Sequence, residues 1–213
     1  MNKGDALIVV DVQNDFLPGG NLAVTDGDQI IPVINRLVAA FDGDHIFLTQ
    51  DFHPKDHGSF ASNSEGKSIG EIIDLNGIKQ MLWPDHCVQE TDGALLSSAL
   101  EIASAKIVKK GMDPKYDSYS GFKDANGAPT DLERVLLVAG VDDQKKFLLT
   151  ICGLATDYCV KFTALDAVAL GYSVQVVIDA CRGVGIPAGN IEASIKEMEE
   201  AGITIVKSEQ ILP

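Results

Sequence analysis

A single cysteine, Cys159, stands where the sequence changes from a strand pattern to a helix pattern, and a thiol there can act as a nucleophile. The run before it, FLLTIC at 147–152, is short and apolar, as in a strand covered on both faces. Apolar residues then recur at helical spacing. We therefore expect Cys159 in or near a first helical turn, where unpaired N–H groups and the helix dipole favour a thiolate. The alternative is an inert thiol, because free cysteines are among the most buried residues.

Asp11 and Lys110 could activate such a thiol. A free thiol has a pKa of about 8.5 and is mostly protonated at pH 7, so it needs a base, a nearby cation, or both. The Asp11 carboxylate can accept the proton, and the Lys110 ammonium can stabilise the negative charge. None of the four histidines (His45, His53, His57 and His86) lies near Cys159 in the sequence, so we expect a carboxylate to act as the base.

A second group of residues could hold a metal ion. In the segment Asp51-Phe52-His53 the alternation of a strand aims both polar side chains to one side, and His86 can supply a third ligand. One carboxylate and two imidazoles suit Zn²⁺, Fe²⁺ or Mn²⁺ and leave positions open for water or substrate. His57 and Ser59 lie nearby, and the sequence leaves open whether they contribute to the metal shell.

Aromatic residues near these groups could form a pocket. Phe16, Trp83 and Tyr119 all fall at predicted strand ends or in loops. They could be ordinary packing residues, or they could form the wall of a slot for a flat ligand, since small-ligand pockets are mostly apolar with a few polar anchors.

Strand and helix patterns alternate along the chain and must position these residues. The apolar runs that predict strands are Ala6–Val12, His45–Gln50, Ala105–Lys109, Phe147–Cys152, Ser173–Ile178 and Ile203–Val206. The segments with helical spacing are Ile30–Ala40, Asp131–Ala139, Asp157–Leu170 and Asn190–Ala201, and Gly171 and Gly202 follow two of them as C-terminal stops. This order predicts a three-layer, doubly wound α/β fold with a mostly parallel six-stranded sheet.

Such sheets bind ligands beyond the carboxyl ends of their strands. By position in the pattern, Asp11, Asp51, Lys110 and Cys159 each follow or end a different predicted strand. The four residues should therefore meet at one edge of the sheet.

Composition limits the partners and the location of the protein. The 213 residues contain no linker-like stretch, so we expect one domain over residues 1–213. The formal net charge of −14 argues against nucleic acid and anionic membranes as partners. The chain has no apolar run long enough to span a bilayer and no signal-peptide pattern, which predicts a cytoplasmic protein with free thiols at its four cysteines. A homo-oligomer is compatible with the sequence, which does not define the oligomeric state.

Five ordered segments resemble the nicotinamidase family, within the isochorismatase-like cysteine hydrolases, over nearly the whole chain. The segments are VVDVQNDFLPGGNLAV (9–24), QDFHPKDHGSFAS (50–62), WPDHCVQ (83–89), KKGMDPKYDSYSGF (109–122) and GLATDYCVKFTALDAVALGY (153–172). The resemblance implies an amidohydrolase that converts nicotinamide to nicotinate and ammonia for NAD salvage.

The resemblance also implies roles for individual residues. Asp11, Lys110 and Cys159 would form the catalytic triad. Lys110 is assigned in preference to Lys109 because it directly precedes Gly111, as in the family motif. The three residues Asp51, His53 and His86 would bind one divalent ion, with Zn²⁺ expected first and Fe²⁺ or Mn²⁺ left open. Phe16, Leu22, Trp83 and Tyr119 would pack on the substrate ring.

In similar enzymes the metal binds the pyridine nitrogen, and Cys159 would attack the carboxamide carbon to form a thioester. Both tetrahedral intermediates carry an oxyanion, which needs preorganised N–H donors. The resemblance implies a cis Leu154–Ala155 peptide bond that aims the Ala155 and Cys159 amides into one oxyanion hole.

Three other functions are compatible with parts of this pattern. An isochorismatase would need neither the nucleophilic Cys159 nor the pair His53 and His86. A cysteine amidase of the same fold could act on another small amide, such as pyrazinamide or a carbamoyl or ureido compound. A non-catalytic binding protein would be expected to have a damaged triad, and the sequence shows no such damage.

Overall fold

The structure is a computed structural model that describes residues 5–102, 104–142 and 147–212. A six-stranded sheet forms its centre, with the spatial order β5-β2-β1-β6-β7-β8, and every neighbouring pair is parallel. The sheet strands are β1 (Ala6–Val10), β2 (Ile46–Asp51), β5 (Lys106–Lys110), β6 (Leu148–Leu154), β7 (Ser173–Arg182) and β8 (Thr204–Val206). The predicted three-layer α/β fold is confirmed.

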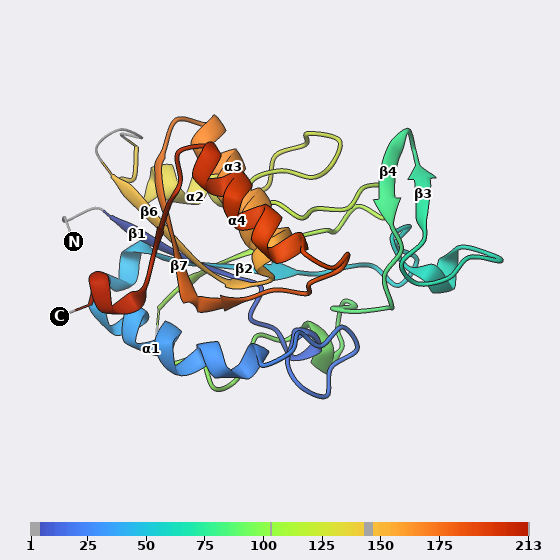
Figure 1. Cartoon of the computed structure of the whole chain (residues 1–213), viewed down its shortest axis with the longest axis horizontal. Coiled ribbons are helices and arrows are strands. Elements are labelled where there is room, and N and C mark those ends of the chain that lie inside the picture. The colour runs from blue at the N-terminus through green and yellow to red at the C-terminus, as the bar shows by residue number, and fades with distance from the viewer. Residues whose placement is uncertain (1–4, 103, 143–146, 213) are drawn as a thin grey trace.

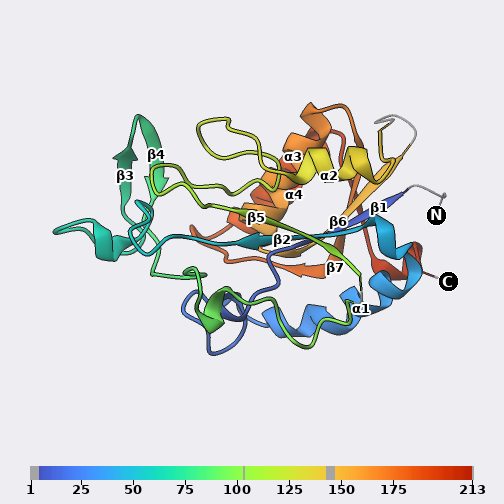
Figure 2. The same cartoon turned by 180° about the vertical axis from the view of Figure 1, so that it is seen from behind.

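Four α-helices cover the two faces of the sheet. They are α1 (Ile31–Ala40), α2 (Leu132–Val138), α3 (Lys161–Ala169) and α4 (Asn190–Glu200). Helix α1 lies on one face, and α2, α3 and α4 lie on the other (Figures 1 and 2). As predicted, Gly171 and Gly202 follow α3 and α4 with φ angles of 96° and 88°, a conformation that glycine adopts without steric cost. None of the helices in the described ranges is long and apolar enough to cross a membrane.

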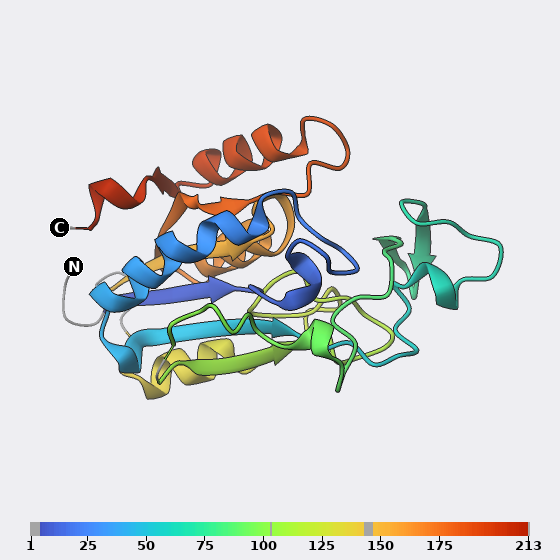
Figure 3. The same cartoon turned by 90° about the horizontal axis from the view of Figure 1, so that it is seen from below.

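A two-stranded antiparallel hairpin, β3 (Ile72–Leu75) and β4 (Ile78–Met81), is absent from the predicted elements. Its turn is Asn76-Gly77, with φ angles of 53° and 85°. Figure 3 shows that the hairpin stands apart from the main sheet, beyond the ends toward which the sheet strands point. It therefore stands at the same end of the molecule as the expected site.

The core of the sheet explains why the site residues are held rigidly. All five residues of β1 and all six of β2 are buried, and the last six residues of β6 are buried as well. Asp11 directly follows β1, and Asp51 and Lys110 are the last residues of β2 and β5. Adjacent parallel strands thus bring these three side chains to one edge of the sheet.

Candidate active site

Cys159 lies in a single π-helical turn, Thr156–Val160, between β6 and α3. The predicted helix 157–170 therefore begins as a wider turn, a feature that often occurs at functional sites. The Leu154–Ala155 peptide bond that precedes it is cis, as the resemblance implies. Cys159 is buried, with 6% of its surface exposed.

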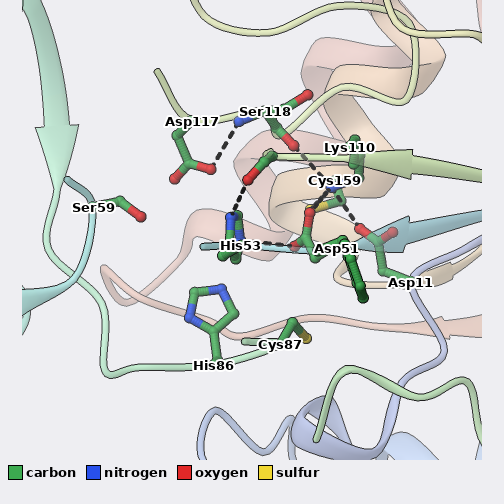
Figure 4. A network of polar contacts seen from close by, with 12 residues as sticks. Asp11, Asp51, His53, Ser59, His86, Cys87, Lys110, Asp117, Ser118 and Cys159 are labelled. Carbon is green, nitrogen blue, oxygen red and sulfur yellow. Dashed lines mark hydrogen bonds and ion pairs between the residues drawn. The ribbon is translucent and has the colours of Figure 1, made fainter. Parts of the chain in front are cut away.

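Lys110 occupies the centre of the site (Figure 4). Its Nζ lies 2.9 Å from Asp11 Oδ2, 2.5 Å from Asp51 Oδ1 and 3.5 Å from Cys159 Sγ. It also donates to the carbonyl oxygen of Ser118 at 2.8 Å. The side chain is 1% exposed, whereas the neighbouring Lys109 is exposed on the other face of β5, with its Nζ 3.6 Å from the Phe52 ring centroid.

Asp11 is held in an unusual backbone conformation. Its φ of 48° lies in the left-handed region, where Asp is enriched among non-glycine residues. The Thr49 hydroxyl donates to Asp11 Oδ1 at 2.6 Å and accepts from the Asp11 backbone N–H at 3.2 Å. Among the residues that the structure describes, the polar contact of Asp11 Oδ2 is its ion pair with Lys110. A carboxylate oxygen of Asp11 lies within 4.8 Å of Cys159 Sγ, close enough for Asp11 to act as its base after a small movement.

The two carboxylates compete for one ammonium group. Burial alone would lower the pKa of Lys110, but Asp11 and Asp51 reverse this effect and raise it well above its ordinary value. Burial raises the pKa of Asp51, and Lys110 and His53 outweigh burial, so the net pKa is lowered. For Asp11, burial is only partly offset by Lys110, and Asp51 adds repulsion, so the pKa is raised. Asp11 is thus the carboxylate that can take up a proton.

The Cys159 thiol needs a base, as expected from the sequence, because its surroundings disfavour the thiolate. Burial raises the pKa of the Cys159 thiol well above its ordinary value, and Lys110 offsets this only in part. The negative charges of Asp11 and Asp51 add to the rise. The helix dipole does not compensate for burial next to two carboxylates, so the thiol keeps its proton until Asp11 takes it.

Asp51, His53 and His86 place one ligand atom each within 4.8 Å of one another. His53 Nδ1 lies 2.8 Å from the Gly111 carbonyl oxygen, and His86 Nδ1 lies 2.8 Å from that of Pro84. A carbonyl oxygen can only accept, so each Nδ1 carries a proton and each Nε2 is the nitrogen that can bind a metal.

The electrostatics of these three residues also suit a cation. Burial lowers the pKa of His86 to about 4, so its ring is neutral at pH 7, the form that binds metals. Burial would lower the pKa of His53 too, but Asp51 more than restores it. The space between His53 Nε2 and Asp51 Oδ2, which are 3.7 Å apart, therefore favours a positive charge. The three residues fit a divalent ion.

His57 lies beside this group, and its Nδ1 has different partners from those of His53 and His86. The Ser59 N–H donates to His57 Nδ1 at 3.2 Å, and the Ser59 hydroxyl lies 2.7 Å from the same nitrogen. The ring proton is then on His57 Nε2, a buried atom with no hydrogen-bond partner among the described residues. His57, His53 and Asp117 form a second group whose ligand atoms lie within 4.8 Å of one another, so His57 borders the metal-binding group without belonging to the set Asp51, His53 and His86.

A small pocket connects the nucleophile with the metal-binding group. The four residues expected to pack on a substrate ring, Phe16, Leu22, Trp83 and Tyr119, all line it, together with Asp51, His86, Ala155 and Cys159. The sequence analysis missed three further lining residues, Asp117, Tyr158 and Val184. A larger depression of about 580 Å³ lies against β5 and the 111–131 loop, but Lys110 is its only lining residue from the assigned site.

Gln13 was also missed. Its side chain accepts from the Asp51 N–H at 2.7 Å and donates to the Asp51 carbonyl oxygen at 2.8 Å and to that of Ala94 at 2.9 Å. It thus fixes the end of β2 from which Asp51 projects. Gln13 pairs with the N–H and the carbonyl oxygen of Asp51, and such contacts with backbone groups cannot be read from the sequence. The sequence shows only a polar residue after an apolar run.

Comparisons with known proteins agree with this arrangement. The isochorismatase domain family matches residues 5–210. A nicotinamidase of Acinetobacter baylyi is 46% identical over 209 residues, covering 97% of this chain and 94% of the relative. Among solved structures, a nicotinamidase and pyrazinamidase of Acinetobacter baumanii has a TM-score of 0.93 at 42% identity, with both chains fully covered. A pyrazinamidase of Pyrococcus horikoshii in complex with zinc has a TM-score of 0.77 at 37% identity, covering 96% of this chain and 99% of the other.

Proposed function

The chain belongs to the isochorismatase family, and from that premise we propose that it hydrolyses nicotinamide to nicotinate and ammonia through a thioester on Cys159. One observation carries the proposal: the buried Lys110 ammonium contacts Asp11, Cys159 and the metal-binding residue Asp51 at the same time. A nucleophile and a site for a ring nitrogen thus share one pocket. Nicotinate formed in this way would feed NAD salvage.

The reaction begins with proton transfer from the Cys159 thiol to Asp11, whose raised pKa suits it as a base. The sulfur attacks the carboxamide carbon and forms a tetrahedral intermediate. Its collapse breaks the C–N bond, and Asp11 returns the proton so that ammonia leaves. Asp11 then takes a proton from the water that attacks the thioester and passes it to the leaving thiolate, which restores the thiol. The acid formed releases its remaining proton to solvent and leaves as nicotinate.

Lys110 stabilises the charges that arise in these steps. Its ammonium lies 3.5 Å from Cys159 Sγ and 2.9 Å from Asp11 Oδ2, so the thiolate and the returning carboxylate both form beside a positive charge. The backbone N–H groups of Ala155 and Cys159 would bind the oxyanion of both intermediates. Asp11 thus moves the proton, Lys110 stabilises the charges on sulfur and carboxylate, and the two N–H groups bind the oxyanion.

Asp51, His53 and His86 would hold a divalent ion, and Zn²⁺ is the first candidate because the Pyrococcus horikoshii relative is in complex with zinc. When bound, the ion supplies a Lewis acid for the ring nitrogen of the substrate. His57 borders these ligands, and its Nδ1 lies beside the Ser59 N–H and hydroxyl. Phe16, Leu22, Trp83 and Tyr119 pack on the ring and exclude water.

The test is ammonia release from nicotinamide by the zinc-loaded protein and by two variants. We expect Cys159→Ala to lower kcat by at least about a thousandfold, since removal of a nucleophile has effects of this order. Cys152→Ala, which removes a buried thiol in β6 away from the pocket, is the matched control and should retain activity. Metal content is measured on the same samples. If the zinc-loaded protein hydrolyses carbamoyl or aliphatic amides but not nicotinamide, the assignment is wrong.

A further inference from the structure

Asp117 is a carboxylate in the pocket to which the proposed reaction gives no task. It lies on the loop between β5 and α2, lines the pocket and is 4% exposed. Figure 4 shows it on the other side of His53 from Asp11. Its carboxylate lies within 4.8 Å of ligand atoms of His53 and His57.

Both carboxylate oxygens of Asp117 are occupied by neutral hydrogen-bond donors. Asp117 Oδ1 accepts from the Ser118 N–H at 2.8 Å, and Oδ2 accepts from Gln80 Nε2 at 3.0 Å. Both oxygens act as acceptors, as expected of a carboxylate. No ion pair joins Asp117 to a lysine or arginine within the described ranges. It therefore contributes an unneutralised negative charge to the pocket.

The charges around the pocket can be counted from these contacts. Asp11, Asp51 and Asp117 are negative and Lys110 is positive. For these four side chains, a divalent ion on the metal-binding group would bring the sum to zero, with the thiol and the histidine ligands neutral; the buried Asp157 carboxylate behind Val184 lies outside this count. Without Asp117, the loaded site would be more positive by one charge.

The proposed reaction changes the charge of the bound molecule in place, because a neutral amide becomes a carboxylate. A pocket with a net positive charge would hold the product more tightly than the substrate, whereas a neutral pocket would not. We propose that Asp117 is a specificity-determining residue whose negative charge makes the metal-loaded pocket less positive and so weakens binding of the carboxylate product relative to the amide substrate. The inference rests on the proposed function.

Trp83 allows this to be measured without turnover. It is the single tryptophan of the chain and lines the pocket, so its fluorescence reports occupancy directly. Binding of nicotinate and nicotinamide is titrated on the zinc-loaded protein with the nucleophile removed (Cys159→Ala). In that background we compare the parent with Asp117→Asn, which keeps the shape but loses the charge, and with Asp117→Glu, which keeps the charge but changes the reach.

We expect Asp117→Asn to bind nicotinate about tenfold more tightly, the effect of two unit charges roughly 10 Å apart at an effective dielectric constant of about 20. Nicotinamide affinity should change by less than about threefold, because the amide is uncharged. Asp117→Glu should keep the parent preference, and so should Asp113→Asn, which removes an exposed charge from the same loop.

The outcomes separate the two levels of the proposal. Unchanged nicotinate affinity in Asp117→Asn, with normal nicotinamide binding, overturns the role of Asp117 and leaves the proposed function intact. Equal tightening in Asp117→Glu also overturns it, because the effect would then follow from geometry and not from charge. If the parent binds neither molecule, the proposed function itself fails.

Discussion

One lysine connects two groups of residues that the sequence analysis treats separately. Lys110 pairs with Asp11 of the triad and with Asp51 of the metal-binding group, at 2.9 and 2.5 Å. Burial raises the pKa of both carboxylates; at Asp51 the charges of Lys110 and His53 outweigh it, whereas at Asp11 Lys110 offsets it only in part and Asp51 adds repulsion. The division of roles between the two aspartates thus follows from the different charges that surround them.

Thr49 is the residue through which this balance can be shifted. Thr49→Val removes the hydroxyl that donates to Asp11 Oδ1 at 2.6 Å and keeps the side-chain shape. Loss of a donor to the charged form raises the pKa of Asp11 further. We therefore expect the acidic limb of the kcat/KM profile to move to higher pH. An unchanged acidic limb would show that Asp11 does not control it.

The residues with a chemical task and their grouping could be predicted from their types and positions, but the ion pair between Lys110 and Asp51 that joins the two groups could not. Asp11, Asp51 and Lys110 were expected at one edge of the sheet because each ends a strand. The Lys110–Asp51 pair depends on side-chain direction and on the register of β2 with β5, where Asp51 lies opposite Lys110. Asp117 was missed because it lies in a long loop, where no periodicity shows which side chain faces inward.

At the scale of elements, the turn that holds Cys159 is tied to the loop after β7. Asp157, two residues before Cys159, is 1% exposed and accepts from the Val184 N–H at 2.8 Å, the Gly185 N–H at 2.9 Å and Asn190 Nδ2 at 3.1 Å. Val184 lines the pocket. One side chain therefore positions both the nucleophile turn and a wall of the pocket.

Asp157→Asn is expected to weaken this connection. The asparagine side chain has one acceptor oxygen and one donor NH2, so the NH2 would face one of the two N–H groups, of Val184 or Gly185, that now donate to the carboxylate. Loss of one such charged hydrogen bond costs about 1.5–3 kcal/mol. We expect urea unfolding to show a loss of this size and kinetics to show a higher KM for nicotinamide. Adding Asn190→Asp restores a donor–acceptor pair between positions 157 and 190. The double variant should therefore regain part of the lost stability and part of the lost affinity for nicotinamide. A double variant no better than the single one would contradict this role.

The loop after β5 depends on a glycine. Gly111 has a φ of 64°, and a Cβ at this position would lie 2.4 Å from His53 Cε1 and 2.6 Å from Nδ1. Gly111→Ala should therefore displace the His53 ring and lower zinc affinity by at least about tenfold, as changes behind a metal ligand do.

Gly127→Ala is the matched control for this change. Gly127 has a φ of 86°, but a Cβ there would meet no atom within 4 Å. Both variants carry the backbone cost of a left-handed alanine, about 1–2 kcal/mol, and only Gly111→Ala disturbs His53. Zinc content after dialysis against a buffered zinc concentration separates them. Similar zinc loss in both variants would mean that the backbone cost alone is responsible.

The strands and helices of the main sheet could be predicted because their apolar periodicity reflects burial. The hairpin β3–β4 was missed because both strands have only four residues and little of either is buried, so their sequences show no clear alternation of apolar and polar residues. A local signal was nevertheless present, since Asn-Gly between short apolar runs is typical of a two-residue hairpin turn. The hairpin is relevant to the site, because Gln80 of β4 donates to Asp117 and to the Tyr119 hydroxyl.

For the whole molecule, the four buried cysteines should make stability fall at high pH. Burial raises the pKa of Cys181 from 9.0 to about 12. Between these values the unfolded thiol loses its proton and the folded thiol keeps it, so the unfolded state binds fewer protons and the free energy of unfolding decreases as pH rises. The stabilisation is complete below pH 9 and is lost toward pH 12.

At pH 10, Cys181 alone should account for a loss of about 1.4 kcal/mol relative to pH 8. Burial also raises the pKa of Cys152 and Cys87, so similar losses add to it. Urea unfolding under reducing conditions at the two pH values measures the total. In Cys181→Ala the difference between the two pH values should shrink by about 1.4 kcal/mol. An unchanged difference would show that this thiol is not protected from ionisation in the folded protein.

The order of strands in the sheet also affects how the chain folds as it is synthesised. β1 lies between β2 and β6, and all five of its residues are buried, yet β6 is synthesised long after it. On the ribosome, this apolar strand has one open edge for most of the time needed to make the protein, and open edges promote association between chains. Chaperone supply and lower growth temperature are therefore expected to raise the yield of folded protein.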